Sequence, residues 1–526
     1  MEKALGLFHR NKQQLYFALL ATFIWGLLAH GYGFMQSSFS HDSLNEFCGT
    51  VFGNHFKYMT GRFLSPIYRS VFRTPITLPW LIGMLALLWI GLSVFFVGKI
   101  FNIESKMVIF LTAGIFTVNI TVMTTAATYM HDLDCDMMAL LCSIVAVFLW
   151  QRYRLGWLVG ALFVTASLSF YQAFITVTIV LVLFVCIFNL MEGIAFKCVF
   201  RKGMEAIGML IVGGIIYYLG MKTAMRITGL TMITGQQNTM DRPLEMLSWE
   251  PWVYRYLLDQ TYIRWYTRLT ESVSPFPVVT AYATNILLIL TGLGLLVCIL
   301  SRKMQILEKI LCTILVALIP FAMHLMYVLT IESAHEVMIF AIWLTYLLAL
   351  LVAQRFAEWL KQTVEHFTGL QFLHRCPETI ASFLVLVILY GNVQTANALY
   401  VKKDLEQDAY LSMMTRVVYR MEEQDGYIPG ETPVVFVGLP SNMNKVIPGF
   451  ESYTQILGMD SNDVLVWHER DRWMAYFRYI LSDPAVFAEE PIWTQIQEDT
   501  RVLKMPSYPE KGSIEMLDGN LVVKLS

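Results

Sequence analysis

Long apolar stretches recur along this chain between residues 15 and 395. A helix that crosses the hydrocarbon core of a bilayer needs about 20 mostly apolar residues. Within lipid the backbone must satisfy its own hydrogen bonds, so stretches of this length form transmembrane helices. We expect eleven of them, near residues 15–34, 78–98, 107–128, 137–150, 155–171, 173–191, 204–221, 277–299, 307–328, 337–354 and 378–395.

The composition agrees with a chain that lies mostly in a membrane. Of the 526 residues, 56% are hydrophobic and only 15% are charged, which leaves too little polar surface for a soluble protein of this length. The net charge is −2, and no basic run is long enough to bind nucleic acid. We therefore predict a polytopic α-helical membrane protein whose surroundings are the lipid bilayer.

The short loops predict an orientation, because Lys and Arg are retained on the cytoplasmic side. If the N-terminus is cytoplasmic, the basic short loops all fall inside. The short loops near residues 129–136 and 329–336 then fall outside, and they contain no Lys or Arg. Eleven spans place the C-terminus on the extracytoplasmic side.

Two longer outside loops, residues 36–77 and 222–276, break this charge rule. Each contains arginines interleaved with aromatic residues, in "GRFLSPIYRSVFR" (61–73) and "WEPWVYRYLLDQTYIRWYTRL" (249–269). This pattern predicts amphipathic helices in the membrane interface, with aromatics toward lipid and arginines toward headgroups. Such a helix either braces the bundle or provides a basic site for a lipid phosphate.

The chain changes character after the last apolar stretch. We predict a membrane domain over residues 1–398 and a small extracytoplasmic α/β domain over residues 399–526. From residue 400 onward there are 12 Lys and Arg against 20 Asp and Glu. Residues 432–440 and 519–526 have the pattern of strands, and residues 469–481 have helical periodicity.

Polar side chains gather at the predicted outer ends of the spans. Ionisable groups near a bilayer are costly and usually mark a site. Any one of them alone is most often solvated or structural, but four outside loops carry them and would converge above the bundle. These candidates are His41, Asp42, His131, Asp132, Asp134, Asp136, Tyr171, Gln172, His335 and Glu336.

The loop "TYMHDLDCDMM" (128–138) holds three of these carboxylates at alternate positions. In an extended segment Asp132, Asp134 and Asp136 share one face, whereas in a helix only Asp132 and Asp136 do. Three clustered carboxylates suit a divalent cation with oxygen ligands. They also raise one another's basicity and provide a base. The spacing leaves both uses open.

Most predicted spans have apolar centres, with charge at their outer edges. A transporter would instead carry polar groups along a path through the bundle. This placement favours a reaction at the outer interface over passage across the membrane.

The segments "SHDSL", "GRFLSPIY", "YMHDLD" and "FYQAF" together resemble a known family. Over residues 15–395 the chain is similar to the bacterial integral-membrane glucosyltransferases of the O-antigen serotype-converting type, within the GT-C superfamily. The resemblance implies transfer of a sugar, glucose in this family, from a polyprenyl-phosphate carrier to a cell-surface glycan. The reaction would take place at the outer face of the bacterial cytoplasmic membrane. A flippase or exporter of a lipid-linked glycan is the alternative.

The resemblance also implies roles for particular residues. The first-loop aspartate of the superfamily, which deprotonates or orients the acceptor, corresponds to Asp42. Many relatives have two acidic residues there, whereas this chain has His41 before Asp42. The acidic position of the second loop corresponds to Asp132, with Asp134 as the alternative.

The chemistry of such a transfer adds further candidates. A departing phosphate needs positive charge, and arginine suits phosphate oxygens, so Arg62, Arg69 and Arg73 are predicted to bind the donor. A single displacement would invert the anomeric centre. The remaining predicted substrate-binding residues are His131, Tyr171, Gln172, His335 and Glu336.

Overall fold

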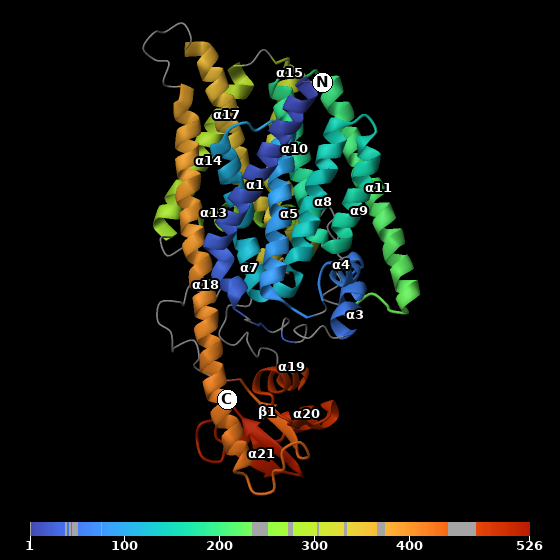
Figure 1. Cartoon of the computed structure of the whole chain (residues 1–526), viewed down its shortest axis with the longest axis vertical. Helices are drawn as coiled ribbons and strands as arrows, with labels where there is room; N and C mark the ends of the chain where they lie inside the picture. Colours follow the sequence, from blue (N-terminus) through green and yellow to red (C-terminus); the bar gives the residue numbers. More distant parts are fainter. Residues whose placement is uncertain are drawn as a thin grey trace.

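The fold is a helical bundle followed by a small sheet (Figure 1). In Figure 1 the start of the first helix and the C-terminal sheet lie at opposite ends of the bundle. The computed structural model describes residues 2–36, 39–40, 44, 51–74, 76–233, 251–271, 277–301, 304–330, 334–364, 374–439 and 470–526.

Every apolar stretch predicted from the sequence is largely helical. Within the described residues, nine helices are long and apolar enough to cross a bilayer. The bundle helices are α1 (Glu2–Met35), α5 (Pro79–Ile100), α6 (Lys106–Thr117), α7 (Ile120–Thr128), α8 (Leu133–Arg152), α9 (Gly156–Phe170), α10 (Ile175–Met191), α11 (Phe196–Thr228), α14 (Pro277–Ser301), α15 (Ile306–Met323), α17 (Leu344–Val364) and α18 (Cys376–Glu422).

Two of the eleven predicted spans differ from a simple crossing. The helix α9 has only 15 residues. The stretch 107–128 is not one straight helix, because α6 and α7 meet at an angle of 42°. Asn119 causes the break: its Oδ1 accepts a hydrogen bond from Val122 N at 3.1 Å, and its Nδ2 donates to Ile115 O at 2.9 Å. A side chain that caps one helix and closes the other turns the chain between them.

Helix α18 is far longer than a bilayer crossing. Its 47 residues extend about 70 Å at 1.5 Å per residue, and in Figure 1 it runs along the bundle and on to the sheet. Leu389 and Leu399 are buried in the core of the bundle, whereas Tyr410 and Val417 belong to a second core with the sheet. The predicted division at residue 398 stays a prediction, and α18 passes through it without a break.

The C-terminal sheet has four strands in the order β2 (Val486–Phe487), β1 (Pro433–Val437), β4 (Asn520–Lys524) and β3 (Ile514–Leu517). Strand β1 pairs in parallel with β2 and β4, and β3 pairs antiparallel with β4. The strands predicted over 432–440 and 519–526 are thus confirmed. The helix predicted over 469–481 is also confirmed: it comprises α19 (Arg470–Tyr476) and a π-helical turn to Leu481.

The second core also includes the start of the first long loop. Phe39 and Leu44 are buried among its residues. The Phe39 and Tyr476 rings meet edge to face with centroids 6.0 Å apart, and Gln407 Nε2 on α18 donates to Phe39 O at 2.9 Å. The beginning of the loop is therefore attached to the C-terminal region as well as to the bundle.

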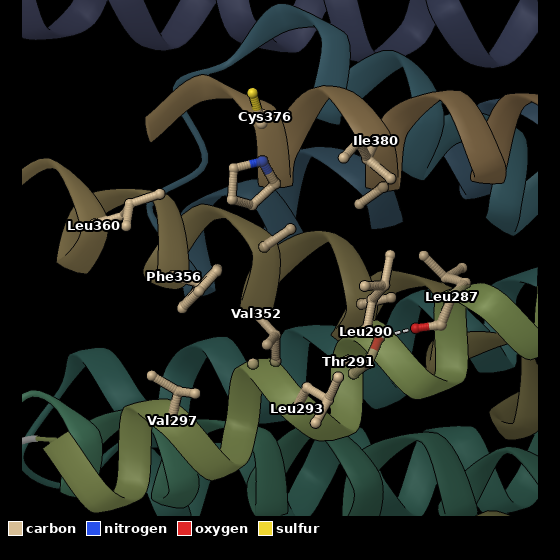
Figure 2. Close-up of a pocket in the computed structure, with 15 residues that line it drawn as sticks. Leu287, Leu290, Thr291, Leu293, Val297, Val352, Phe356, Leu360, Cys376 and Ile380 are labelled. Carbon is tan, nitrogen blue, oxygen red and sulfur yellow. Dashed lines mark hydrogen bonds between the residues drawn. The ribbon is translucent and has the colours of Figure 1, made fainter. Parts of the chain in front are cut away.

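An apolar cavity of about 400 Å³ lies between α14, α17 and α18 (Figure 2). Leu290, Val352, Phe356 and Ile380 line it, and the one hydroxyl that Figure 2 labels belongs to Thr291, which donates to Leu287 O at 2.6 Å. Apart from Thr291 and Cys376, the described residues that line it are apolar or aromatic. Such a lining suits hydrocarbon.

Glycines allow the helices around α9 to approach closely. A Cβ at Gly213 on α11 would lie 2.9 Å from Ala161 O and 2.7 Å from Val164 Cγ1, both on α9. A Cβ at Gly160 on α9 would lie 3.0 Å from Ala146 O on α8. Small residues at such crossings are typical of membrane helices, whose backbones pack by close contact.

We predict that Gly213→Leu destabilises the bundle. The new side chain must displace the α9 backbone, and overpacking of this kind costs about 1–3 kcal/mol. Thermal unfolding in detergent should occur several degrees lower than in the unsubstituted protein.

Gly214→Leu is the matched control. A Cβ at Gly214 meets nothing within 4 Å, and the two substitutions gain the same helix propensity. Equal unfolding temperatures for the two variants would contradict the close crossing.

Candidate active site

The site is assembled where the first long loop meets the start of α8. The loop contributes α3 (Val51–Met59) and α4 (Leu64–Phe72), and a 3₁₀ turn (Met130–Asp132) leads into α8. These elements lie at the end of the bundle that faces the sheet (Figure 1). We use the name charge cluster for Lys57, Arg62, Arg69, Arg73, Asp132, Asp134 and Asp136.

Asp132 is the centre of the charge cluster. Its carboxylate accepts hydrogen bonds from Lys57 Nζ at Oδ2 and from Arg69 Nη2 at Oδ1. His131 Nε2 lies 3.5 Å from Oδ2. The Asp132 side chain is only 8% exposed. A carboxylate buried to this degree needs such partners to remain ionised, and here they come from a loop more than 60 residues earlier in the chain.

Asp134 forms a separate pair with Arg73. The Arg73 Nε and Asp134 Oδ2 atoms are 3.1 Å apart, with side-chain exposures of 1% and 0%. These two atoms form an ion pair, but their geometry is unsuitable for a hydrogen bond. Asp134 Oδ1 accepts a hydrogen bond from Cys135 N at 3.0 Å, and Arg73 Nη2 donates to His131 O. This pair is closed to solvent, which indicates a structural role.

Asp136 differs from the other two carboxylates. It lies in the first turn of α8 and is 5% exposed. In the described part of the chain it forms no ion pair and accepts no hydrogen bond. The three aspartates therefore do not act as equivalents, although their spacing in the sequence is regular.

Arg62 is the least restrained cation of the cluster. Its guanidinium stacks on the Tyr171 ring, 4.2 Å from the centroid. Its Nη1 lies 3.7 Å from Asp132 Oδ2, which is too long for a hydrogen bond, and its Nε makes none. With 20% of its side chain exposed, Arg62 is available to an anion that approaches from outside.

Gln172 holds the turn that carries Arg62. Its Nε2 donates to Thr60 O at 2.8 Å and to the Tyr217 hydroxyl at 2.9 Å. Gly61, between Thr60 and Arg62, has a φ of +79°, and a Cβ there would lie 2.4 Å from the Tyr217 hydroxyl. Glycine is needed at this position for both its backbone conformation and its size. Gln172 is thus placed as a support for the site.

Arg69 on α4 and Arg73 directly after it do not point toward headgroups as the sequence suggested. Arg69 and Arg73 are 8% and 7% exposed and face the charge cluster, because Asp132 and Asp134 draw them inward. Nearby, Tyr68 accepts a hydrogen bond from Trp89 Nε1 at 2.8 Å. Burial, with the Asp134 charge close by, raises the pKa of the Tyr68 phenol.

The second long loop turns one of its arginines, Arg268, inward. It forms α12 (Pro251–Leu258), a π-helical turn and α13 (Arg264–Thr270). Arg268 Nη1 pairs with Glu336 Oε1 at 2.9 Å, while Trp252 and Tyr254 are exposed. Trp252 and Tyr254 thus face outward as predicted, and Arg255 and Arg264 are exposed as well, whereas Arg268 turns toward Glu336.

Glu336, which directly follows His335, contacts the second long loop. Glu336 pairs with Arg268, and its carbonyl accepts a hydrogen bond from Thr121 Oγ1 of α7 at 2.7 Å. His335 is exposed. The contacts that the described residues show for the Glu336 side chain and carbonyl thus lead to Arg268 and Thr121.

His41 and Asp42 lie outside the described residues. The neighbouring Ser40 donates a hydrogen bond to Thr128 O, and Leu44 N donates to Ser40 O at 3.1 Å. Thr128 ends α7, immediately before the turn that carries His131 and Asp132.

Sequence reasoning missed Lys57. It forms an ion pair with Asp132, yet "VFGNHFKYM" (51–59) contains no motif that marks it. Its one signal was a Lys in a loop predicted to be outside, where basic residues are disfavoured.

No group of three or more His, Cys, Asp or Glu is placed to hold a metal ion in the described ranges. Asp132 and Asp134 pair with Lys57, Arg69 and Arg73, and the divalent cation stays a prediction.

Comparison with known families adds one match. The family described as "Glucosyl transferase GtrII" matches residues 31–353, a range that includes the whole charge cluster. No curated protein and no solved structure matches the chain.

We predict that Asp134 and Arg73 are needed as a pair. Asp134→Leu leaves the Arg73 charge buried without its partner, which costs about 3–5 kcal/mol. The variant should give little folded protein, or unfold far below the unsubstituted protein in detergent.

The double variant Arg73→Met with Asp134→Leu is the control, because an apolar pair of similar volume is often tolerated. It should recover most of the lost thermal stability. Additive losses from the two substitutions would show that the two side chains do not interact.

Proposed function

The chain belongs to the GtrII glucosyl transferase family, and from this premise we propose its donor, location and mechanism. The donor is glucose linked to a polyprenyl phosphate, and the acceptor is a cell-surface glycan. The reaction takes place at the outer face of the bacterial cytoplasmic membrane, with the N-terminus cytoplasmic and the C-terminal region outside.

One observation carries the proposal: Arg62 is a cation without a hydrogen-bonded carboxylate, beside a buried group of charges. Lys57, Arg69 and Arg73 are each held by Asp132 or Asp134. Arg62 instead stacks on Tyr171. Stacking holds the guanidinium plane in place and leaves its N–H groups for phosphate oxygens.

The charges of the cluster suit a phosphodiester. Its four cations, Lys57, Arg62, Arg69 and Arg73, outnumber Asp132 and Asp134, the two carboxylates that form ion pairs with them. The phosphate of a polyprenyl-phosphoglucose carries one negative charge. Binding would offset part of this excess positive charge, which a buried environment favours.

The position of the cluster supports a lipid-linked donor. The described end of α7 and the start of α8, both helices of the bundle, adjoin it. A phosphate at this depth leaves its polyprenyl chain in hydrocarbon and presents its sugar to the aqueous side. A nucleotide sugar would need no such placement.

The proposed reaction is a single displacement. The acceptor hydroxyl attacks the anomeric carbon, the bond to the phosphate oxygen breaks, and the configuration inverts. Arg62 stabilises the negative charge that develops on the leaving phosphate. The role that the family resemblance gives to Asp42 is to orient or deprotonate the acceptor.

The alternative of a flippase or exporter gains no support. The family match concerns sugar transfer. The buried charges that the structure describes in this region are tied to one another at one end of the bundle and do not line a path through it.

We predict that Arg62→Met lowers the rate of glucose transfer by about 10²–10³-fold, the usual cost of removing one group that stabilises a developing negative charge. The assay follows radiolabelled glucose from polyprenyl-phosphoglucose to an acceptor glycan, using the purified full-length protein. Arg62→Lys should keep part of the activity, because it retains the charge but not the planar fork.

Arg226→Met is the control. Arg226 is exposed in the last turn of α11 and should be dispensable. No transfer by the unsubstituted protein would overturn the donor, and an unchanged rate in Arg62→Met would remove Arg62 from donor binding. Loss of transfer in EDTA that Mg²⁺ restores would add a divalent cation to the mechanism.

A further inference from the structure

The apolar cavity between α14, α17 and α18 exists because small side chains face one another there. Gly294 lies on α14, Ala349 and Ala353 on α17, and Ala381 on α18. Larger residues at these positions would fill the space between the helices. The cavity measures about 400 Å³, a usual size for a ligand pocket, and a dry apolar cavity of about 150 Å³ already binds benzene. It is therefore large enough for part of a hydrocarbon chain.

The cavity opens on the outer surface of the bundle (Figure 2). Among the residues that line it, Leu287 and Val352 are each 1% exposed, whereas Leu293 and Ile380 are 53% and 46% exposed. All four side chains belong to helices that are long and apolar enough to cross a bilayer. The exposed side of the cavity therefore faces lipid, and an occupant would enter it from the hydrocarbon rather than from water.

Lys361 and Arg375 are exposed cations at one end of the cavity. Lys361 directly follows the lining residue Leu360 near the end of α17, and Arg375 directly precedes the lining residue Cys376 at the start of α18. Among the described residues, no carboxylate lies at ion-pair distance from either cation. This end of the bundle lies opposite the sheet (Figure 1). An anion held by these cations would have the apolar cavity beside it.

We propose that the cavity binds an acyl chain of an anionic phospholipid, whose phosphate is held by Lys361 and Arg375. Basic residues between membrane helices at the cytoplasmic side suit anionic headgroups, and in the orientation proposed above this is the cytoplasmic side. An acyl chain needs no hydrogen bond from the lining, and the Thr291 hydroxyl already donates to Leu287 O at 2.6 Å.

The polyprenyl chain of the proposed donor is a different lipid. Its phosphate is assigned to Arg62, at the end of the bundle that faces the sheet, whereas Lys361 and Arg375 lie at the opposite end (Figure 1). The phospholipid site therefore does not depend on the proposed reaction. It can be occupied in a protein that transfers no glucose, so the two proposals fail separately.

The cavity is tested by native mass spectrometry of the purified full-length protein in detergent, with phosphatidylglycerol or phosphatidylcholine added. The unsubstituted protein should retain phosphatidylglycerol in preference. Val297→Trp places a large ring in the cavity and should lower the retained phosphatidylglycerol severalfold. Leu296→Trp is the matched control, because Leu296 is the adjacent residue, is 52% exposed and is not among the described residues that line the cavity.

The headgroup contact is tested by Lys361→Gln combined with Arg375→Gln. The preference for phosphatidylglycerol over phosphatidylcholine should fall by about fivefold for each charge removed. Both side chains are exposed, so this variant should fold even if Val297→Trp does not. Arg152→Gln combined with Arg154→Gln is the control, since these exposed arginines lie at and just beyond the end of α8 and should leave the preference unchanged.

Three results would overturn the inference. Equal retention in Val297→Trp and Leu296→Trp would show that the lipid binds elsewhere. Equal retention of the two phospholipids by the unsubstituted protein, or an unchanged preference after Lys361 and Arg375 are replaced, would remove the anionic headgroup. Displacement of the retained phosphatidylglycerol by added polyprenyl phosphate would assign the cavity to the carrier lipid instead.

Discussion

The structure depends on keeping opposite charges together at the end of an apolar bundle. Asp132 and Asp134 are buried on the turn into α8, where a lone carboxylate would be unfavourable. The first long loop supplies their counter-charges, Lys57, Arg69 and Arg73. These ion pairs fix α3 and α4 against the bundle. The same loop carries Arg62 beside these pairs, so the arrangement that stabilises the loop also positions the group that we propose binds the donor phosphate.

Much of this architecture could be predicted from the sequence. The apolar stretches predicted the helices, and the acidic segment 128–138 pointed to the turn where Asp132 and Asp134 meet Lys57, Arg69 and Arg73. The family resemblance is confirmed by the match over residues 31–353. The bend at Asn119 escaped prediction because one asparagine within an apolar run carries no periodic signal.

The different surroundings of the three aspartates could not be predicted. Asp132, Asp134 and Asp136 have identical chemistry and regular spacing, and their differences arise from partners that lie 60 or more residues away in sequence. Lys57 was missed for the same reason. The inward direction of Arg69 and Arg73 follows from these pairs, because an interface helix of the same composition could equally face its arginines outward.

The length of α18 has a mechanical consequence. The N-terminal part of α18 packs in the bundle. Further along the helix, Lys403 donates a hydrogen bond to Ala127 O beside the site, and Tyr410 belongs to the core of the sheet. Each residue added to a helix rotates the remainder of that helix by about 100° and moves it 1.5 Å along the axis. An insertion between Lys403 and Tyr410 would therefore swing the sheet around the helix axis and pull Phe39 away from Tyr476. The length of α18 therefore fixes both the distance and the rotation of the sheet relative to the bundle. The C-terminal region tolerates new side chains on its surface far more readily than the insertion or deletion of one residue in this helix.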